Sequence, residues 1–147
     1  MPPEYHPRQR VLVVQRDDAL RETLREVLED TGYEVLEARE GEDALAILHT
    51  NEQGGMVVIL DQFMPRLDGA ELLREVAQDR KLTKSYSFIL LSAARLSMRI
   101  ALVRLLTKLA VQVVSKPFEV DDFLAAVATA SQHLSNLSAP SAPADGR

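Results

Sequence analysis

The stretch VVILDQFMPRLDG, from Val57 to Gly69, decides how this sequence is interpreted. A run of apolar residues leads into a single carboxylate, Asp61, and the chain then turns through Met64-Pro65. A short apolar run bounded by turn residues is typical of a strand buried on both faces of a sheet. In α/β proteins, the residues just beyond the carboxyl ends of such strands form the binding site. The stretch therefore predicts a buried strand that ends in a candidate functional carboxylate.

Apolar strands and amphipathic helices alternate through most of the chain. Strands are predicted at residues 10–14, 33–38, 56–60, 87–92 and 111–115, and helices at residues 19–32, 41–50, 68–79, 96–109 and 120–134. Short β-branched strands between amphipathic helices indicate a parallel sheet that is covered on both faces. Right-handed crossovers make that sheet doubly wound. The predicted fold class is therefore α/β, a doubly wound five-stranded parallel sheet with five helices.

Composition limits the classes of function. The 147 residues carry a net charge of −5 and no cysteine, so disulfides and cysteine zinc sites are excluded. The acidic balance provides no basic field for nucleic acid, and no apolar run is long enough to span a bilayer. We expect a cytoplasmic protein that binds neither nucleic acid nor membrane directly. Residues 9–134 are predicted to form the domain, between an N-terminal extension at 1–8 and a disordered Ser/Ala/Pro-rich tail at 135–147.

Polar residues close the apolar runs at the carboxyl ends of four predicted strands. They are Gln15, Arg16 and Asp17 after the first, Asp61 after the third, Ser92 in the fourth and Lys116 after the fifth. Each has an ordinary structural explanation, since a carboxylate after a strand is most often a helix cap. Together they also suit phosphoryl transfer, in which Asp61 attacks an activated phosphorus and forms an acyl phosphate. Lys116 would then supply a positive charge and Ser92 a hydroxyl donor to the phosphoryl oxygens.

The segments LDQFMPRLDG, LLSAA and VSKPF resemble the receiver domain of two-component response regulators, over about Gln9 to Leu134. The resemblance implies a flavodoxin-like receiver fold, with Asp61 as phosphoacceptor, Ser92 as switch hydroxyl and Lys116 as the lysine of the site. It also implies a histidine kinase or phosphotransfer protein as partner. Enzymatic activity is not expected beyond self-phosphorylation and dephosphorylation of Asp61.

The residues after the first strand depart from the family pattern. Receivers usually carry two adjacent acidic residues there, which hold a divalent cation. Without a gap, Gln15 and Arg16 stand at these positions and Asp17 at the next. A gapped alignment would instead move Asp17 and Asp18 into the pair. Because Mg²⁺ prefers carboxylate oxygens, the ungapped alignment predicts no cofactor and weak or absent Mg²⁺ binding. Arg16 is expected to turn inward and pair with Asp61, with a solvent-facing Arg16 as the alternative.

A second departure concerns the interaction face. Val113 stands where the family usually carries a switching aromatic ring in its fifth strand. The fourth predicted helix is more apolar than one buried face requires, so Val113, Leu102, Leu105 and Leu106 are predicted to form an interaction surface. Either a homodimer or docking to a partner is expected through the fourth helix, fifth strand and fifth helix.

Two functions remain open at this point. One is a receiver that responds to phosphorylation of Asp61, and the other is a degenerate receiver that acts as a phosphorylation-independent interaction module. An unrelated small α/β enzyme is disfavoured, because no glycine-rich phosphate loop follows a strand and no nucleophile elbow is present.

Overall fold

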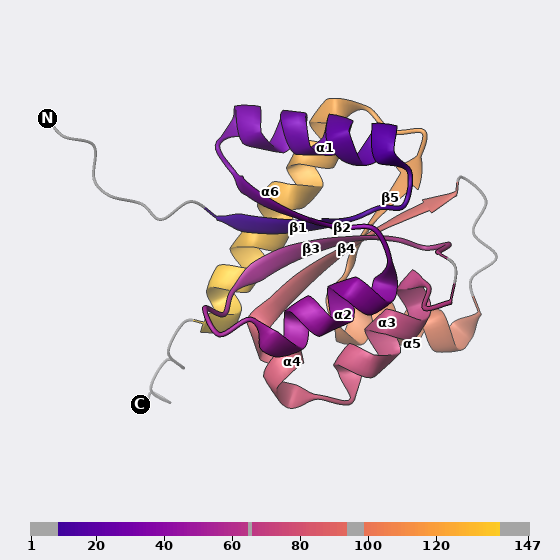
Figure 1. The fold of residues 1–147 in the computed structure, drawn as a ribbon. Coiled ribbons are helices and arrows are strands. Elements are labelled where there is room, and N and C mark those ends of the chain that lie inside the picture. Colours follow the sequence, from indigo (N-terminus) through magenta and orange to yellow (C-terminus); the bar gives the residue numbers. More distant parts are fainter. Residues whose placement is uncertain (1–8, 65, 94–98, 139–147) are drawn as a thin grey trace, which may run out of the picture.

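Five parallel strands form the centre of the protein, in the order β2-β1-β3-β4-β5 (Figure 1). The computed structural model describes residues 9–64, 66–93 and 99–138. The strands are β1 (Arg10–Val14), β2 (Glu34–Ala38), β3 (Met56–Asp61), β4 (Tyr86–Ala93) and β5 (Gln112–Lys116). All four neighbouring pairs run parallel. This order is the doubly wound, flavodoxin-like arrangement, so the predicted fold class is confirmed.

Helices cover both faces of the sheet (Figure 1). They are α1 (Asp18–Thr31), α2 (Gly41–Thr50), α3 (Gly69–Ala77), α4 (Arg80–Ser85), α5 (Ile100–Lys108) and α6 (Val120–Ser138). One layer of the core lies between the sheet and helices α1 and α6, and the other lies under α2, α3 and α5. None of the helices in the described ranges is long and apolar enough to cross a bilayer.

Strand β3 is the central strand, and each of its residues is buried. Its side chains alternate between the two layers, because successive residues of a strand point to opposite faces. Val58 and Leu60 join the layer under α2, α3 and α5, whereas Val57 and Ile59 join the layer under α1 and α6. Asp61 ends this strand and therefore projects at the carboxyl edge of the sheet.

Local side-chain chemistry sets several helix boundaries. The Asp17 carboxylate caps α1 by accepting a hydrogen bond from the backbone N–H of Leu20 at 3.1 Å. Gly32 ends this helix with φ of 105°, a left-handed conformation that favours glycine. Asp68 and Glu71 form a reciprocal capping box at the start of α3. The first helix therefore begins directly after Asp17.

The structure corrects two element assignments. The described residues form six helices, because Asp79 caps the short helix α4 between α3 and β4, where the sequence pattern predicted no helix. Helix α6 continues to Ser138, so residues 135–138 are helical, and Leu137 packs against the core. Helix α5 is described from Ile100, and the predicted start of this helix at residues 96–98 lies outside the described residues. The same is true of the predicted N-terminal extension and of the tail from residue 139.

Gly69 begins α3 directly behind Asp61. A Cβ atom at this position would lie 2.6 Å from the carbonyl oxygen of Asp61 and 2.8 Å from Cδ1 of Leu90. We expect Gly69→Ala to lower the free energy of unfolding by about 1–3 kcal/mol, because the backbone of β3 has to move. Urea denaturation measures the change. An unchanged or higher midpoint, as the better helix propensity of alanine alone would give, would contradict this account.

Candidate functional site

The carboxyl ends of β1, β3 and β5 bring three of the predicted residues together. Gln15 Nε2 donates a hydrogen bond to Asp61 Oδ2 at 2.8 Å, and Lys116 Nζ donates to the same oxygen at 2.5 Å. Only 7% of the surface of Asp61 is exposed. A buried carboxylate is costly unless it is paired and hydrogen-bonded, and these two donors supply both.

The two oxygens of Asp61 are in different environments. Oδ2 accepts from Gln15 and Lys116, whereas Oδ1 accepts a longer hydrogen bond, 3.3 Å, from the backbone N–H of Phe63. The Oδ1 bond is slightly longer than the usual range for N–H donors. Oδ1 is therefore the more available oxygen of the carboxylate.

Gln15 is held from three directions. It is 4% exposed, and its Oε1 accepts from the backbone N–H of Asp17 at 3.2 Å. Its backbone carbonyl accepts from Nη1 of Arg21 at 2.9 Å, and its backbone N–H donates to the carbonyl of Ala38 at 3.0 Å. These contacts fix the orientation of the amide, with its oxygen towards Asp17 and its nitrogen towards Asp61.

Arg21 is itself anchored by acidic neighbours. Its guanidinium lies 2.7 Å from Asp18 and 3.3 Å from Glu37. The hydrogen bond from Arg21, with the charge of Arg39, holds the pKa of the exposed Asp18 carboxyl below its usual value. The hydrogen bond to Asp18 raises the pKa of Arg21 in turn. The contact between Arg21 and the carbonyl of Gln15 thus comes from a side chain that is fixed on the surface of α1.

The predicted inward pairing of Arg16 with Asp61 is wrong. Arg16 is exposed and forms no ion pair with the described residues, whereas Gln15 occupies the inward position. Val14, the last residue of β1, pairs in register with Leu60, so Gln15, which follows it, lies beside Asp61. The gapped alignment is excluded as well, because Asp17 caps α1 and Asp18 pairs with Arg21.

Ser92 lies next to the site but its hydroxyl has no hydrogen-bond partner among the described residues. It is fully buried, one residue beyond Leu91, the register partner of Asp61. Gln62 shares this condition, since it is buried and its Oε1 has no described partner. Sequence analysis missed Gln62, although a polar residue directly after Asp61 was a visible signal. The unsatisfied hydroxyl of Ser92 can therefore donate to an added oxygen, and the unsatisfied Oε1 of Gln62 can accept from an added donor.

A divalent cation does not fit the side chains of this site. Mg²⁺ needs several oxygen ligands in a near-octahedral arrangement. The described residues contain no group of three or more His, Cys, Asp or Glu side chains that could hold a metal. The nearest neighbours of Asp61 are an amide nitrogen and an ammonium group, which are both donors. The residues present supply one carboxylate and no second acidic ligand.

The predicted interaction residues divide between core and surface. Leu102 and Leu106 are buried in the core under α5, and Leu105 is half-buried against it, so these leucines do not form an exposed patch. The exposed apolar side chains on this side of the molecule are Ile100, Val103 and Val113, which are 71%, 45% and 39% exposed. The excess of apolar residues in this helix is thus mostly used by the core.

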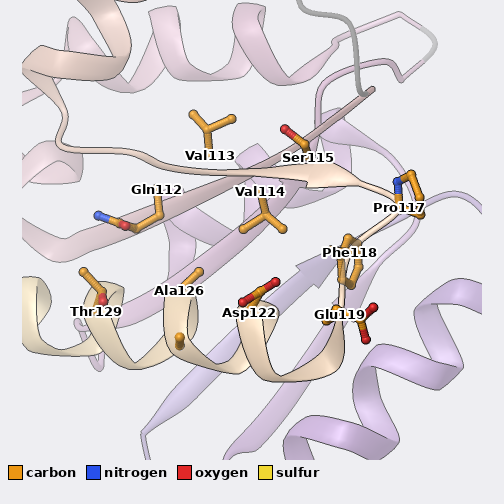
Figure 2. A pocket seen from close by; sticks show the side chains of 11 residues that line it. Gln112, Val113, Val114, Ser115, Pro117, Phe118, Glu119, Asp122, Ala126 and Thr129 are labelled. Atoms are coloured by element: carbon orange, nitrogen blue, oxygen red, sulfur yellow. The ribbon is translucent and has the colours of Figure 1, made fainter.

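A groove of about 550 Å³ lies between β5 and α6. Figure 2 shows that Gln112 and Val114 point from β5 towards α6, whereas Val113 and Ser115 point to the other face. Asp61, Gln15 and Lys116 are not among its lining residues. The groove is therefore separate from the carboxylate site.

Comparisons with known proteins agree with this geometry. The model of the response regulator receiver domain family matches residues 11–128. Response regulator MprA of Mycobacterium sp. (strain KMS) is 45% identical over 67 residues, which are 46% of this chain and 28% of that protein. MprA of Mycobacterium avium (strain 104) is 43% identical over the same share of each chain. The match thus spans little more than a quarter of the length of these curated relatives.

Solved structures show the same fold. The signal receiver domain of an HD domain-containing protein from Pseudomonas fluorescens has a TM-score of 0.71 at 23% identity, covering 88% of this chain and 99% of that one. A CheY-like response regulator receiver domain protein from Methanospirillum hungatei has a TM-score of 0.68 at 22% identity, covering 88% and 96%. At these identities, the likeness establishes the fold.

Removing the lysine of the ion pair should destabilise the domain. We expect Lys116→Met to lower the free energy of unfolding by about 1–2 kcal/mol, because Asp61 stays buried with one charged partner fewer. The figure is at the low end for buried pairs because the Lys116 side chain is 33% exposed. Lys108→Met, at an exposed position near the end of α5, is the matched control. Equal effects of the two variants in urea denaturation would show that the ion pair does not stabilise the fold.

Proposed function

The chain belongs to the response regulator receiver domain family, whose members act in two-component signalling, and we propose that Asp61 is its phosphoacceptor. Receiver domains are in general signalling modules rather than enzymes. The observation that carries the proposal is the contact between Lys116 and Asp61 at the carboxyl edge of a doubly wound sheet. This is where such folds place their reactive groups.

The chemistry proposed for Asp61 is attack on a phosphoimidazole. Oδ1, the less strongly bonded oxygen, would attack the phosphorus of a phosphohistidine on a histidine kinase or phosphotransfer protein. An O–P bond forms, the P–N bond breaks, and the leaving imidazole takes up a proton. The Lys116 ammonium would balance the added negative charge, and the unpartnered Ser92 hydroxyl would donate to a phosphoryl oxygen. Any enzymatic activity is limited to this self-phosphorylation and to hydrolysis of the acyl phosphate.

We propose that the reaction is slow and depends little on Mg²⁺. A divalent cation would normally neutralise the phosphoryl oxygens and align them for attack. Here the positions of the family's acidic pair hold Gln15 and Arg16, and the former already donates to Asp61. Lys116 is then the one fixed cation in direct contact with the carboxylate among the described residues.

A phosphorylation-independent interaction module is the second candidate function. It is favoured by the closed hydrogen-bonded arrangement of Gln15, Asp61 and Lys116, which needs neither metal nor phosphate. Val113 favours it too, because a valine has one preferred rotamer and cannot swing as an aromatic ring does. In this role, the face of α5, β5 and α6 would bind a partner or a second copy of the chain in a single state.

Phosphodonor labelling distinguishes the two functions. With a small phosphodonor, we expect slow addition of one phosphoryl group, at rates within about twofold with and without millimolar Mg²⁺, since no acidic pair recruits the cation. Intact mass followed by peptide mapping measures the rate and the site. Asp61→Asn should abolish the label and is the control. Absence of any label after prolonged incubation would reject the phosphoacceptor role and leave the interaction module.

Self-association should be insensitive to phosphorylation. We expect a dimer at micromolar concentration with and without phosphodonor, formed through α5, β5 and α6, because exposed apolar side chains there favour burial. Val103→Asp should shift the sedimentation coefficient to that of the monomer. Ala46→Asp, which introduces the same charge at an exposed position of α2, outside this face, is the matched control. A monomer under both conditions would exclude the homodimer, and a dimer only with phosphodonor would exclude the phosphorylation-independent module.

A further inference from the structure

We propose that Gln15 is a positioning residue that takes the place of a divalent cation beside Asp61. Its amide holds the carboxylate in one orientation and keeps the site from responding to Mg²⁺. The functional meaning of this role rests on the proposed function of Asp61, whereas its geometry does not.

Two donors share one oxygen of Asp61. Gln15 Nε2 and Lys116 Nζ both donate to Asp61 Oδ2. A cation that used this oxygen would have to displace at least one of these donors. Displacing the amide would leave a buried N–H₂ group without its acceptor, which costs free energy.

Gln15 cannot simply reverse its amide to become an oxygen ligand. Its Oε1 accepts from the backbone N–H of Asp17, so a reversed amide would turn its N–H₂ group towards another donor. Its backbone is fixed by Arg21 on one side and Ala38 on the other. The orientation that donates to Asp61 is the one in which every described partner of Gln15 is matched.

Gln15 and Arg16 differ in their exposure to solvent. Both residues replace an acidic position of the family, but Arg16 is exposed and Gln15 is 4% exposed. An exposed guanidinium is screened by solvent and has freedom to move away from an incoming cation. The structure therefore assigns metal insensitivity to one residue, Gln15, and not to the replaced pair as a whole.

The isosteric substitution Gln15→Glu tests this assignment directly. It keeps the shape of the side chain but exchanges the donor for a second carboxylate next to Asp61. Arg16→Glu introduces an acid at the adjacent exposed position and is the matched control. Both variants and the wild type are titrated with Mg²⁺, and the amide shifts of residues 15–17 and 61–63 are followed by NMR.

We expect saturable shifts with a midpoint of about millimolar only in Gln15→Glu, because it alone presents two carboxylates to the cation. The wild type and Arg16→Glu should show no saturation. Saturation in the wild type, or in Arg16→Glu to the same extent as in Gln15→Glu, would overturn the proposal.

Thermal unfolding gives a second readout that does not depend on phosphorylation. Without Mg²⁺, Gln15→Glu should unfold at a lower temperature than the wild type, because two carboxylates face each other. At tenfold excess over its dissociation constant, Mg²⁺ should raise the Tm of this variant by roughly 3–6 °C, since the cation binds only the folded state. Gln15→Met removes the donor without adding an acid, so it should lose stability and gain no response to Mg²⁺. An unchanged Tm in Gln15→Met would show that the amide does not hold Asp61.

Labelling with a phosphodonor keeps this proposal distinguishable from the proposed function. If Gln15→Glu binds Mg²⁺ but neither it nor the wild type labels on Asp61, the phosphoacceptor role is wrong and the role of Gln15 stands. If the wild type labels on Asp61 only with Mg²⁺, the role of Gln15 is wrong and the phosphoacceptor role stands. If both chains label and Mg²⁺ accelerates Gln15→Glu alone, both proposals are supported.

Discussion

The arrangement of the site depends on how the negative charge of one buried carboxylate, Asp61, is balanced by its neighbours. Asp61 ends the central strand of the sheet. Every residue of this strand is buried, and the Asp61 side chain is itself almost inaccessible to solvent. An ionised carboxyl group in such surroundings requires opposite charge and hydrogen-bond donors. Lys116 provides the charge from β5, and Gln15 provides the second donor from β1. The two strands are separated from Asp61 by long stretches of chain, so this compensation exists only when the whole parallel sheet has formed.

Most of the fold follows from patterns that are local in the sequence. Apolar runs of strand length and amphipathic helices predict the sheet and its two covered faces, because the periods of burial differ between strands and helices. The short helix α4 escaped this reasoning, since six residues are too few to show a helical period. Its signal was the cap at Asp79, which the sequence pattern instead assigned to the end of the preceding helix. The extension of α6 to Ser138 escaped for a different reason, because the composition of residues 135–138 is that of a tail while Leu137 still reaches the core.

The candidate site was predictable to the level of which residues meet, but not of how each one points. Parallel strand order places Gln15, Asp61 and Lys116 at one edge, and this much could be inferred from the ends of the apolar runs. The direction of Arg16 depends on the short segment between the end of β1 and the cap of α1 at Asp17. Side chains alternate along a strand, and here the backbone leaves the sheet. Charge complementarity alone favoured the arginine as partner of Asp61. The structure instead uses the smaller neutral amide, which fits a buried position that an arginine would fill only by burying a second charge.

The face formed by α5 and β5 carries Val113 where receivers usually carry a switching aromatic ring. Leu60, Leu90 and Val113 stand in one register row across β3, β4 and β5, and Val113 reaches the surface at the sheet edge. Its short branched side chain has little freedom to change between buried and exposed positions. Two residues further along these strands, Ser92 and Ser115 are in register, and the buried Ser92 hydroxyl has no described partner. A change in the bonding of Ser92 towards Asp61 would therefore act on β5 through a polar row and the backbone, without a ring moving through the core.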